Sequence, residues 1–287
     1  MAVPGLRMGI TITSGAIPSP PTNVLHVGPL ALHVYGLCYA LAVLAAVAIV
    51  RRRWKAQGGS RELVYDVALW GFPAGIVGGR LYYLATTPED SFDHWWGPFA
   101  VWHGGLGIWG GIALGTLVGV WRLRRARADV AAFVDVAAPG LLVAQAIGRV
   151  GNYFNQELFG RPSDLPWAIE IDPEHRPARY LANPTFHPTF LYELLWNLLL
   201  AAALVWLGRH RTIRPPGLFA LYVAGYCAFR IVDELLRVDT AAHVLGLRWN
   251  LLLACGGTVI GLAWFAYSQR SDARRPAGRR ERRHSGE

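Results

Sequence analysis

Seven apolar stretches of about 20 residues dominate the chain. They run roughly over residues 29–50, 64–85, 99–121, 130–150, 187–207, 217–235 and 248–267. A helix that rises about 1.5 Å per residue needs about 20 apolar residues to cross a hydrocarbon core ~30 Å thick. Because 53% of the 287 residues are hydrophobic and only 16% are charged, the chain is too apolar for an ordinary soluble domain. We therefore expect an all-α integral membrane protein with about seven transmembrane helices.

Basic residues give the chain a net charge of +9, and most of them gather in clusters. These clusters lie at residues 51–61, 122–127, 209–214 and 270–283, in every second connection between apolar stretches. The other connections are acidic or mixed, as in TTPEDSFDHWWG. This alternation follows the positive-inside rule and predicts an N-terminus outside the cell and a C-terminus in the cytoplasm. It indicates a bilayer, and no nucleic acid, as the partner of the basic clusters.

Three regions are expected along the chain. Residues 1–28 form an extracytoplasmic segment without a removable signal peptide, because they lack a basic stretch followed by an apolar stretch and a cleavage site. Residues 29–267 form the transmembrane domain, in which the polar, proline-rich stretch 154–186 is a small extracytoplasmic cap or, equally, a structured loop. Residues 268–287 are rich in arginine and are expected to form a disordered cytoplasmic tail. The simpler role for this tail is that of a topology anchor.

Cysteine and histidine positions suggest no metal site. Cys38, Cys227 and Cys255 fall in three different apolar stretches, without the spacing of a disulfide or of metal ligands. No glycine-rich loop follows a strand to bind a nucleotide. We expect inert thiols and neither a metal nor an organic cofactor.

Glycines in the second and third apolar stretches recur every four residues. They are Gly71, Gly75 and Gly79 in one stretch and Gly107, Gly111 and Gly115 in the other. This spacing predicts a smooth face on each helix for close packing against a neighbour. The HGGLG sequence at residues 103–107 instead predicts a bent or loosely wound helix entrance, whose backbone N–H groups can receive an anion.

Ionisable residues inside the apolar stretches are costly in a membrane and therefore indicate function. They are Arg80 in the second stretch, Arg149 with Asn152 at i, i+3 in the fourth, and Tyr226, Arg230, Asp233, Glu234 and Arg237 as one stripe in the sixth. Snorkelling or ion pairing would explain Arg237 and Arg80 equally well. For Arg149 and Arg230 we interpret the apparent surplus of arginine over carboxylate as a site for an anion. The planar guanidinium suits phosphate, so an anionic phospholipid near the outer leaflet is the expected ligand.

One stretch, GRVGNYFNQELFGR at residues 148–161, closely resembles the G-R-x-G-N-[FY]-x-N-x-E-x-x-G signature of the prolipoprotein diacylglyceryl transferase family. Further blocks that are similar to family motifs follow in the family's order: HVYGLCYALA at 33–42, GGRLYY at 78–83, WHGGLGIWGG at 102–111, HPTFLYE at 187–193 and YCAFRIVDELLR at 226–237. Two positions depart from the family pattern. Phe190 stands where glutamine is usual, which puts one polar contact in doubt, and Ile231 stands where phenylalanine is usual.

The resemblance implies a reaction and a location. The diacylglyceryl group of phosphatidylglycerol would pass to the thiol of a lipobox cysteine behind the signal peptide of a bacterial prolipoprotein. The products would be a thioether-linked precursor and glycerol phosphate, in the first step of lipoprotein maturation. The enzyme would reside in the bacterial cytoplasmic membrane as a multi-pass protein, with residues 29–267 as its catalytic domain and without a cofactor.

The chemistry suggests roles for the matched residues. The leaving phosphate is an anion, for which Arg149 and Arg230 are the candidates, with Asn152 and Asn155 as orienting amide donors. The attacking group is a thiolate, and His103 or, as weaker alternatives, Glu157 or Glu234 could take the thiol proton. The expected substrate-binding residues are Tyr35, Arg80, Gly104, Asn152, Asn155, Glu157, Gly160, Tyr226 and Glu234.

Structural roles stay open for several of these residues. His103 could be an interfacial histidine or a binding residue, and Glu157 could simply pair with an arginine. Tyr35 and Tyr226 could belong to an aromatic belt at the membrane surface. We interpret His33 and His187 as structural.

Two other classes of function stay open as well. A transporter or flippase for anionic lipids would also need buried arginines, but it would favour internal repeats, and none is evident in the sequence. A non-catalytic receptor or assembly protein would not require His103 together with the asparagine-rich block.

Overall fold

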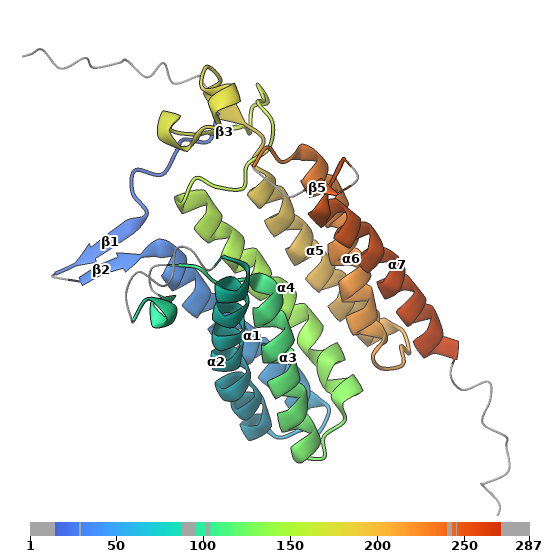
Figure 1. Ribbon diagram of the computed structural model, residues 1–287. Coiled ribbons are helices and arrows are strands. Elements are labelled where there is room, and N and C mark those ends of the chain that lie inside the picture. Colours follow the sequence, from blue (N-terminus) through green and yellow to red (C-terminus); the bar gives the residue numbers. More distant parts are fainter. Residues whose placement is uncertain are drawn as a thin grey trace, which may run out of the picture. The chain divides into compact units, whose positions relative to one another are not determined.

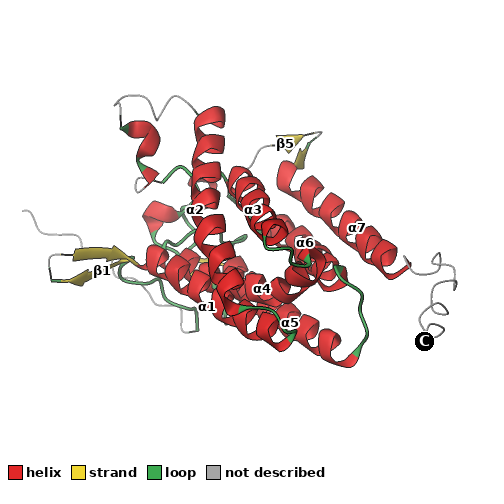
Figure 2. Cartoon of the chain, turned by 90° about the horizontal axis from the view of Figure 1, so that it is seen from below, coloured by secondary structure: helices red, strands yellow, loops and turns green. Residues whose placement is uncertain are grey.

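The computed structural model describes residues 15–28, 30–87, 96–101, 104–239, 243–244 and 246–270. Most of this part of the chain is helical (Figure 2). The helices are α1 (Val34–Ala56), α2 (Arg61–Thr86), α3 (Ile108–Arg125), α4 (Val130–Phe154), α5 (Thr189–His210), α6 (Gly217–Leu236) and α7 (Trp249–Arg270). Three two-stranded antiparallel sheets accompany them: β1 (Val24–Val27) with β2 (Leu30–His33), β3 (Ile169–Glu170) with β4 (Thr185–Phe186), and β5 (His243–Val244) with β6 (Leu247–Arg248). Each of the seven apolar stretches thus corresponds to one helix.

Length and composition qualify four of these helices as membrane spans: α1, α4, α5 and α7. The protein is therefore mostly helical and membrane-associated, while the full count of seven spans stays a prediction. Large apolar side chains are exposed on the helix surfaces, among them Leu44, Leu117 and Val259. Charged and amide side chains are buried instead, as Glu193 and Asn197 in α5 illustrate. This inversion of the usual soluble pattern is expected where lipid surrounds the helices.

The chain divides into two compact units, which are described one at a time. The first comprises Met1–Ala42, Val143–Leu200 and Val223–Ile260. The second comprises Val43–Leu142, Ala201–Tyr222 and Gly261–Glu287.

In the second unit, α2 and α3 run antiparallel and pack through their glycines (Figure 1). A Cβ placed on Gly71, Gly75 or Gly79 would lie 3.6, 3.4 or 3.3 Å from a glycine carbonyl oxygen of the facing segment. The facing glycines are Gly115, Gly111 and Gly107 respectively, so the predicted glycine faces are confirmed. Gly78 and Gly110 approach still more closely, since a Cβ on either would overlap the other's backbone.

The third apolar stretch begins differently from the expectation of a helix near residue 99. Residues 104–107 are not helical, and α3 starts only at Ile108. Gly104 and Gly105 have φ values of 89° and 74°, in the left-handed region that glycine tolerates. The loosely wound entrance predicted from the glycines is therefore confirmed, but two of its N–H groups are occupied. Gly104 N donates to Val101 O, and Gly107 N donates to Gly79 O.

The start of α6 is fixed by a buried carboxylate of α4 within the same unit. Asp135 is 4% exposed, and its Oδ1 accepts a hydrogen bond of 2.7 Å from the backbone N of Phe219. The first N–H groups of a helix lack partners within the helix, so this contact satisfies one of them in place of water. It anchors the helix that carries the polar stripe predicted from the sequence.

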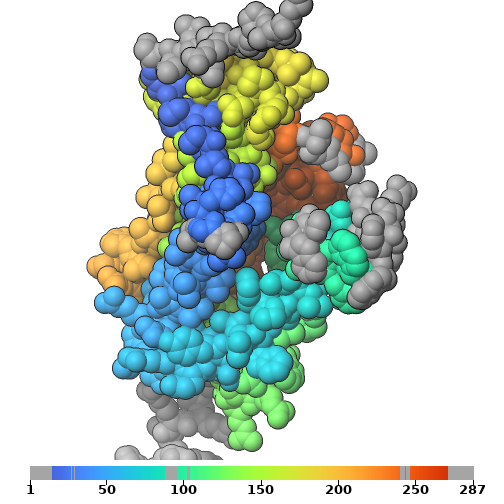
Figure 3. Space-filling model, turned by 90° about the vertical axis from the view of Figure 1, so that its left-hand side faces the viewer, coloured from blue at the N-terminus to red at the C-terminus, as the bar shows by residue number. Residues whose placement is uncertain are grey.

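In the first unit, the stretch between α4 and α5 folds around an apolar cluster of its own. Phe159, Ile169, Ile171 and Phe186 belong to this cluster together with Phe190 and Val238. Strands β3 and β4 pair with Ile169 opposite Phe186, and Ile17 of the N-terminal segment bridges to Ile169. The space-filling view shows the blue N-terminal segment against the yellow stretch (Figure 3). The proline-rich stretch is thus a folded element, whose extracytoplasmic position remains a prediction.

Candidate active site

Glu193 lies at the centre of a group of charged side chains in the first unit. It occupies the second turn of α5, and its side chain is only 2% exposed. Its Oε1 accepts from Arg149 Nη2 of α4 at 2.8 Å and from the hydroxyl of Tyr226 in α6 at 3.1 Å. Its Oε2 lies 3.1 Å from Arg230 Nη1 of α6. One buried carboxylate therefore joins the two arginines predicted from the sequence.

The polar stripe of α6 completes the surroundings of Arg230. Its guanidinium donates to Asp233 three residues on and to Glu234 four residues on, through short contacts. This is the spacing at which side chains of a helix meet on one face. Arg230 is therefore bound by three carboxylates, two from its own helix and one from α5.

A second pair of arginines extends the group beyond α6. Arg237 donates from Nε and Nη2 to the two carboxylate oxygens of Asp239, at 2.7 and 2.9 Å. Arg248 at the end of β6 donates to Glu234 Oε2 at 2.8 Å and to the backbone oxygen of Asp239 at 3.0 Å. The β5–β6 hairpin directly precedes α7 (Figure 2), so the fold brings Arg248 to a stripe that lies 11 or more residues earlier in the chain.

Asp239 titrates outside the helices, and its environment favours the charged form. Burial opposes ionisation, but the hydrogen bonds and charge of Arg237, with the charge of Arg248, lower the pKa of Asp239 below its usual range. A carboxylate with a lowered folded-state pKa stabilises the fold above the pKa of the unfolded chain. This contribution is lost as the pH falls through the lowered pKa.

Charge balance in this group corrects the interpretation made from the sequence. We call the group the arginine–carboxylate network: Arg149, Glu193, Arg230, Asp233, Glu234, Arg237, Asp239 and Arg248. Four arginines meet four carboxylates, so the expected surplus of arginine is wrong for the described residues. The surplus was inferred because Glu193 and Asp239 were not counted: Glu193 lies on α5, and Asp239 follows α6 outside the stripe. Arg237, moreover, is ion-paired and only 8% exposed, which favours pairing over snorkelling.

The most exposed member of the network is Asp239, at 32%, but Arg149 and Arg230 are more exposed than the three carboxylates that bind them. The side chains of Arg149 and Arg230 are 19% and 15% exposed, whereas Glu193, Asp233 and Glu234 are at most 2% exposed. The Nε–H of Arg149 is buried and has no hydrogen-bond partner in the described structure. An anion that approaches Arg149 and Arg230 would therefore meet their guanidinium groups before Glu193, Asp233 and Glu234.

Asn152 connects Arg149 to a fifth carboxylate. Its Oδ1 accepts from Arg149 Nη1 at 3.0 Å, and its Nδ2 donates to Glu157 Oε1 at 2.7 Å. The same oxygen of Glu157 lies 3.4 Å from Asn155 Nδ2. The predicted face of Arg149 and Asn152 is confirmed, because α4 continues to Phe154. Both amides point toward Glu157, so their observed role is to orient protein groups.

Tyr226 and Tyr35 occupy different positions relative to the network. Tyr226 belongs to it through its hydrogen bond to Glu193. Tyr35 packs its ring against Gly151, where a Cβ would overlap the ring, and its hydroxyl lies 3.4 Å from that of Tyr39. The structure thus connects one of the two predicted tyrosines directly to the charged groups.

Gly160 has a packing role in the structure. Its N–H donates to His187 O at 2.8 Å, and a Cβ would crowd His187, Thr189 and the carbonyl of Leu236. Three backbone segments cross at this point, which leaves room for glycine only.

Arg80 and Gly104 belong to the second unit, where they contact each other. Arg80 is buried and donates to the backbone oxygens of Gly97, Pro98, Gly104 and Gly105 at 2.6 to 3.0 Å. These bonds hold the loop before α3 in place, so the structure favours a positioning role for Arg80. His103 lies outside the described residues.

Sequence reasoning missed Glu193, Arg248 and Asp239 as members of the network. Glu193 had a signal, since it ends the HPTFLYE block and is a carboxylate inside an apolar stretch. Arg248 and Asp239 stand in a polar connection, where charges are ordinary. Phe190, which replaces the family's usual glutamine, is 7% exposed and packs in the apolar cluster with Phe186. The polar contact in doubt is therefore absent at Phe190, and an apolar one takes its place.

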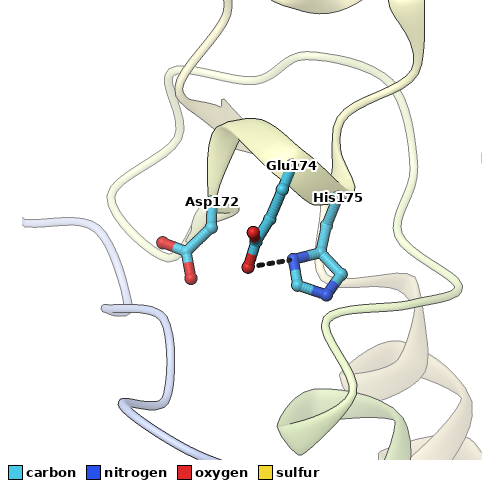
Figure 4. Close-up of side chains that lie close together, drawn as sticks. All are labelled: Asp172, Glu174 and His175. Atoms are coloured by element: carbon cyan, nitrogen blue, oxygen red, sulfur yellow. Dashed lines mark ion pairs between the residues drawn. The ribbon is translucent and has the colours of Figure 1, made fainter.

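A further group of possible ligands lies between α4 and α5. Asp172, Glu174 and His175 offer ligand atoms within 4.8 Å of one another (Figure 4). His175 Nδ1 lies 3.8 Å from Glu174 Oε1, but the Glu174 side chain is 80% exposed. Asp172 is engaged by Gln156, whose Nε2 donates to its carboxylate at 2.6 Å. These contacts explain the proximity of the three side chains without an ion.

Comparison with known proteins gives a consistent result. A family described as "Prolipoprotein diacylglyceryl transferase" matches residues 22–267. A phosphatidylglycerol–prolipoprotein diacylglyceryl transferase 2 of Streptomyces coelicolor is 50% identical over 258 residues, which cover 88% of this chain and 81% of that protein. A phosphatidylglycerol–prolipoprotein diacylglyceryl transferase of Cutibacterium acnes is 46% identical over 260 residues, which cover 88% of this chain and 88% of that protein. Another from Mycolicibacterium paratuberculosis is 48% identical, but the match spans only 58% of its length.

Proposed function

The chain belongs to the prolipoprotein diacylglyceryl transferase family, and from this premise we propose that its arginine–carboxylate network binds the phosphate of phosphatidylglycerol. The protein is a membrane-associated transferase of lipoprotein biosynthesis. It transfers the diacylglyceryl group of phosphatidylglycerol to a prolipoprotein. We assign the accepting group to the thiol of a lipobox cysteine.

The reaction requires a stabilised leaving group. The thiolate sulfur attacks the terminal glycerol carbon of the diacylglyceryl group, a C–S bond forms, and the C–O bond to phosphate breaks. Glycerol phosphate leaves with the electron pair of that bond, so the phosphate gains negative charge in the transition state. Preorganised donors in a water-poor site stabilise such charge strongly. Arg149 and Arg230 are suited to this role, because their guanidinium groups are more exposed than the carboxylates that bind them.

The charge balance of the network suggests how it binds an anion without a surplus of arginine. Arg149 has a buried Nε–H without a partner among the described residues, so a phosphate oxygen that reaches it after a shift of the side chain gains one hydrogen bond without displacing a protein partner. Glu193, which holds both arginines from behind, keeps them close together despite their like charges. Asn152 fixes the orientation of Arg149 through its 3.0 Å bond to Nη1. The observation that carries the proposal is therefore that Arg149 and Arg230 are more exposed than Glu193, Asp233 and Glu234, the carboxylates that bind them.

The thiol proton needs an acceptor, and the contacts separate the two carboxylate alternatives. Glu234 is 0% exposed and binds Arg230 and Arg248 with its two oxygens, which makes it a poor base. Among the described residues, Glu157 accepts hydrogen bonds from side-chain amides and forms no ion pair with arginine, so its carboxylate is the less neutralised of the two. His103 remains the first candidate, because a neutral imidazole can accept a proton near neutral pH.

Purified protein incubated with phosphatidylglycerol and a lipobox peptide tests the function. We expect equal amounts of a thioether-linked diacylglyceryl peptide and glycerol phosphate, detected by mass spectrometry. Lipid movement across vesicles without either product would instead favour the transporter. Neither product nor movement would favour a receptor or assembly protein.

In the same assay, His103→Gln distinguishes a base from a binding residue. General-base catalysis contributes about 10²- to 10⁴-fold, so turnover at saturating lipid should fall by that factor. Raising the pH toward the pKa of the peptide thiol should recover part of the loss. An unchanged turnover at saturation with weaker lipid binding would make His103 a binding residue and leave Glu157 as the base.

The proposed location is the bacterial cytoplasmic membrane, crossed seven times, with the N-terminus outside. We expect the loops beginning at Arg51, Arg122 and Arg209 and the tail after Arg270 in the cytoplasm, and residues 86–98 and 154–186 outside. On a cysteine-free background, an impermeant thiol reagent applied to intact cells should label Glu174→Cys but not Gln57→Cys. The reverse pattern would invert the topology.

A further inference from the structure

Asn197 of α5 is a buried amide that the network does not use. Its side chain belongs to a residue that is 0% exposed, and neither Oδ1 nor Nδ2 has a hydrogen-bond partner in the part of the chain described here. Asn152, in contrast, is equally buried but has both amide atoms bonded. Leaving buried polar atoms unpaired costs about 1–3 kcal/mol, so a buried amide without a partner among the described residues is a candidate to bind a ligand or an ordered water.

The position of Asn197 relative to Glu193 is set by the helix. Residues four apart lie on the same face, about 6 Å apart along the axis. Glu193 contacts Arg149 of α4 and Arg230 of α6, so this face of α5 is the one turned toward the network. Asn197 therefore lies one turn from Glu193 on that face, farther from the start of α5 at Thr189 and deeper in the apolar part of the helix.

The lipid substrate has polar groups at a matching depth. In a diacylglycerophospholipid, the two ester carbonyls lie a few bonds beyond the phosphate, on the side of the acyl chains. An ester carbonyl is a hydrogen-bond acceptor only, and the amide Nδ2 of asparagine offers two donors. With the phosphate at Arg149 and Arg230, an ester carbonyl would come to lie about one helical turn deeper, at the level of Asn197.

We infer that Asn197 is a substrate-binding residue that donates a hydrogen bond from Nδ2 to an ester carbonyl of the diacylglyceryl group. The inference rests on the proposed function, because it takes the phosphate position from the arginines. It assigns the site a preference for ester-linked over ether-linked lipids. The amide Oδ1 can accept from a water molecule that accompanies the ester group.

The hydrogen bond between Asn197 and the ester carbonyl is tested by comparing two lipids with two proteins, the wild type and Asn197→Leu. Phosphatidylglycerol is compared with its ether-linked analogue, in which the reacting carbon and the phosphate are unchanged and only the carbonyl oxygens are missing. One hydrogen bond corresponds to about a 2- to 13-fold change, so the wild type should use the ester lipid better by that factor in kcat/KM. Asn197→Leu should use both lipids equally, at the level of the wild type with the ether lipid.

Folding of the variant is checked without lipid. Leucine has the branching of asparagine and removes two unpaired polar atoms, which offsets the larger volume of its methyl groups, so the Tm of Asn197→Leu in detergent should stay near that of the wild type. Leu199→Ala, on the exposed side of the same helix, is the control and should keep the wild-type ratio between the two lipids.

Two outcomes overturn the inference. Either the wild type shows no preference for the ester lipid, or Asn197→Leu retains the wild-type preference. Failure of the proposed function is seen separately. Normal transfer by Arg149→Lys with the ester lipid would mean that the arginines do not bind the phosphate, independently of the result for Asn197.

Discussion

Alanine at Arg149 or Arg230 should lower transfer by about 10²- to 10³-fold, because in the proposed mechanism each guanidinium binds the leaving phosphate as it gains charge. Lysine should rescue poorly at both positions. Arg149 uses Nη2 for Glu193 and Nη1 for Asn152, and Arg230 contacts three carboxylates. A single ammonium group cannot reproduce these directions and still offer a fork to phosphate. The measurement is kcat/KM for thioether formation with phosphatidylglycerol and a lipobox peptide.

The lysine variants are more informative than the alanine variants. Alanine leaves buried carboxylates without a counter-charge and can therefore unfold the protein, whereas lysine preserves the charge. Arg211→Ala serves as control, since Arg211 is exposed and its side chain forms no hydrogen bond or ion pair with the described residues. Folded Arg149→Lys and Arg230→Lys proteins with near-normal turnover would exclude the bidentate role of these arginines.

Much of the fold could be predicted from local sequence. Each apolar stretch became a helix, since about 20 apolar residues leave few alternatives in lipid. The glycines of α2 and α3 matched pair by pair, because a four-residue spacing defines a helix face whatever the partner. The start of α3 at Ile108 was missed, since Phe99 and Ala100 are apolar but precede glycines that take left-handed conformations.

The candidate site was predictable only in part. Arg149, Asn152 and Arg230 could be found because a charge or amide in an apolar helix is costly and therefore rare. Their partners could not, since pairing depends on which helices face each other. A count along the stripe of α6 cannot include Glu193 of α5 or Arg248 of β6. The expected arginine surplus arose because such partners from other segments were not counted. For the same reason the sequence did not reveal Asn197, whose lack of hydrogen-bond partners among the described residues is visible only in three dimensions.

The corrected charge balance changes what the network is expected to do. A site with surplus arginine would bind an anion by charge alone and would not distinguish one anion from another. A balanced network attracts anions less and depends on geometry, through the donor directions of Arg149 and Arg230. Selectivity for a phospholipid would then come from donors that match both the phosphate and the groups below it.

Glu193 is the residue whose loss should affect stability most. Glu193→Gln keeps an oxygen that can accept a hydrogen bond from Tyr226, but it removes the negative charge that offsets the repulsion between Arg149 and Arg230. Two half-buried arginines would then face each other without their shared counter-ion. Breaking a buried ion pair from one side costs about 3–5 kcal/mol, so we expect a marked fall in Tm in detergent micelles and loss of transfer.

An exposed glutamate provides the matched comparison for this prediction. Glu174→Gln makes the same chemical change on a side chain that is 80% exposed, 3.8 Å from His175. Exposed ion pairs contribute about 0–1 kcal/mol, so its Tm and activity should stay near those of the wild type. Equal Tm values for Glu193→Gln and the wild type would mean that Glu193 is not the counter-ion of the two arginines. The proposed phosphate site would then lose its structural basis, because in the proposal Glu193 holds Arg149 and Arg230 together.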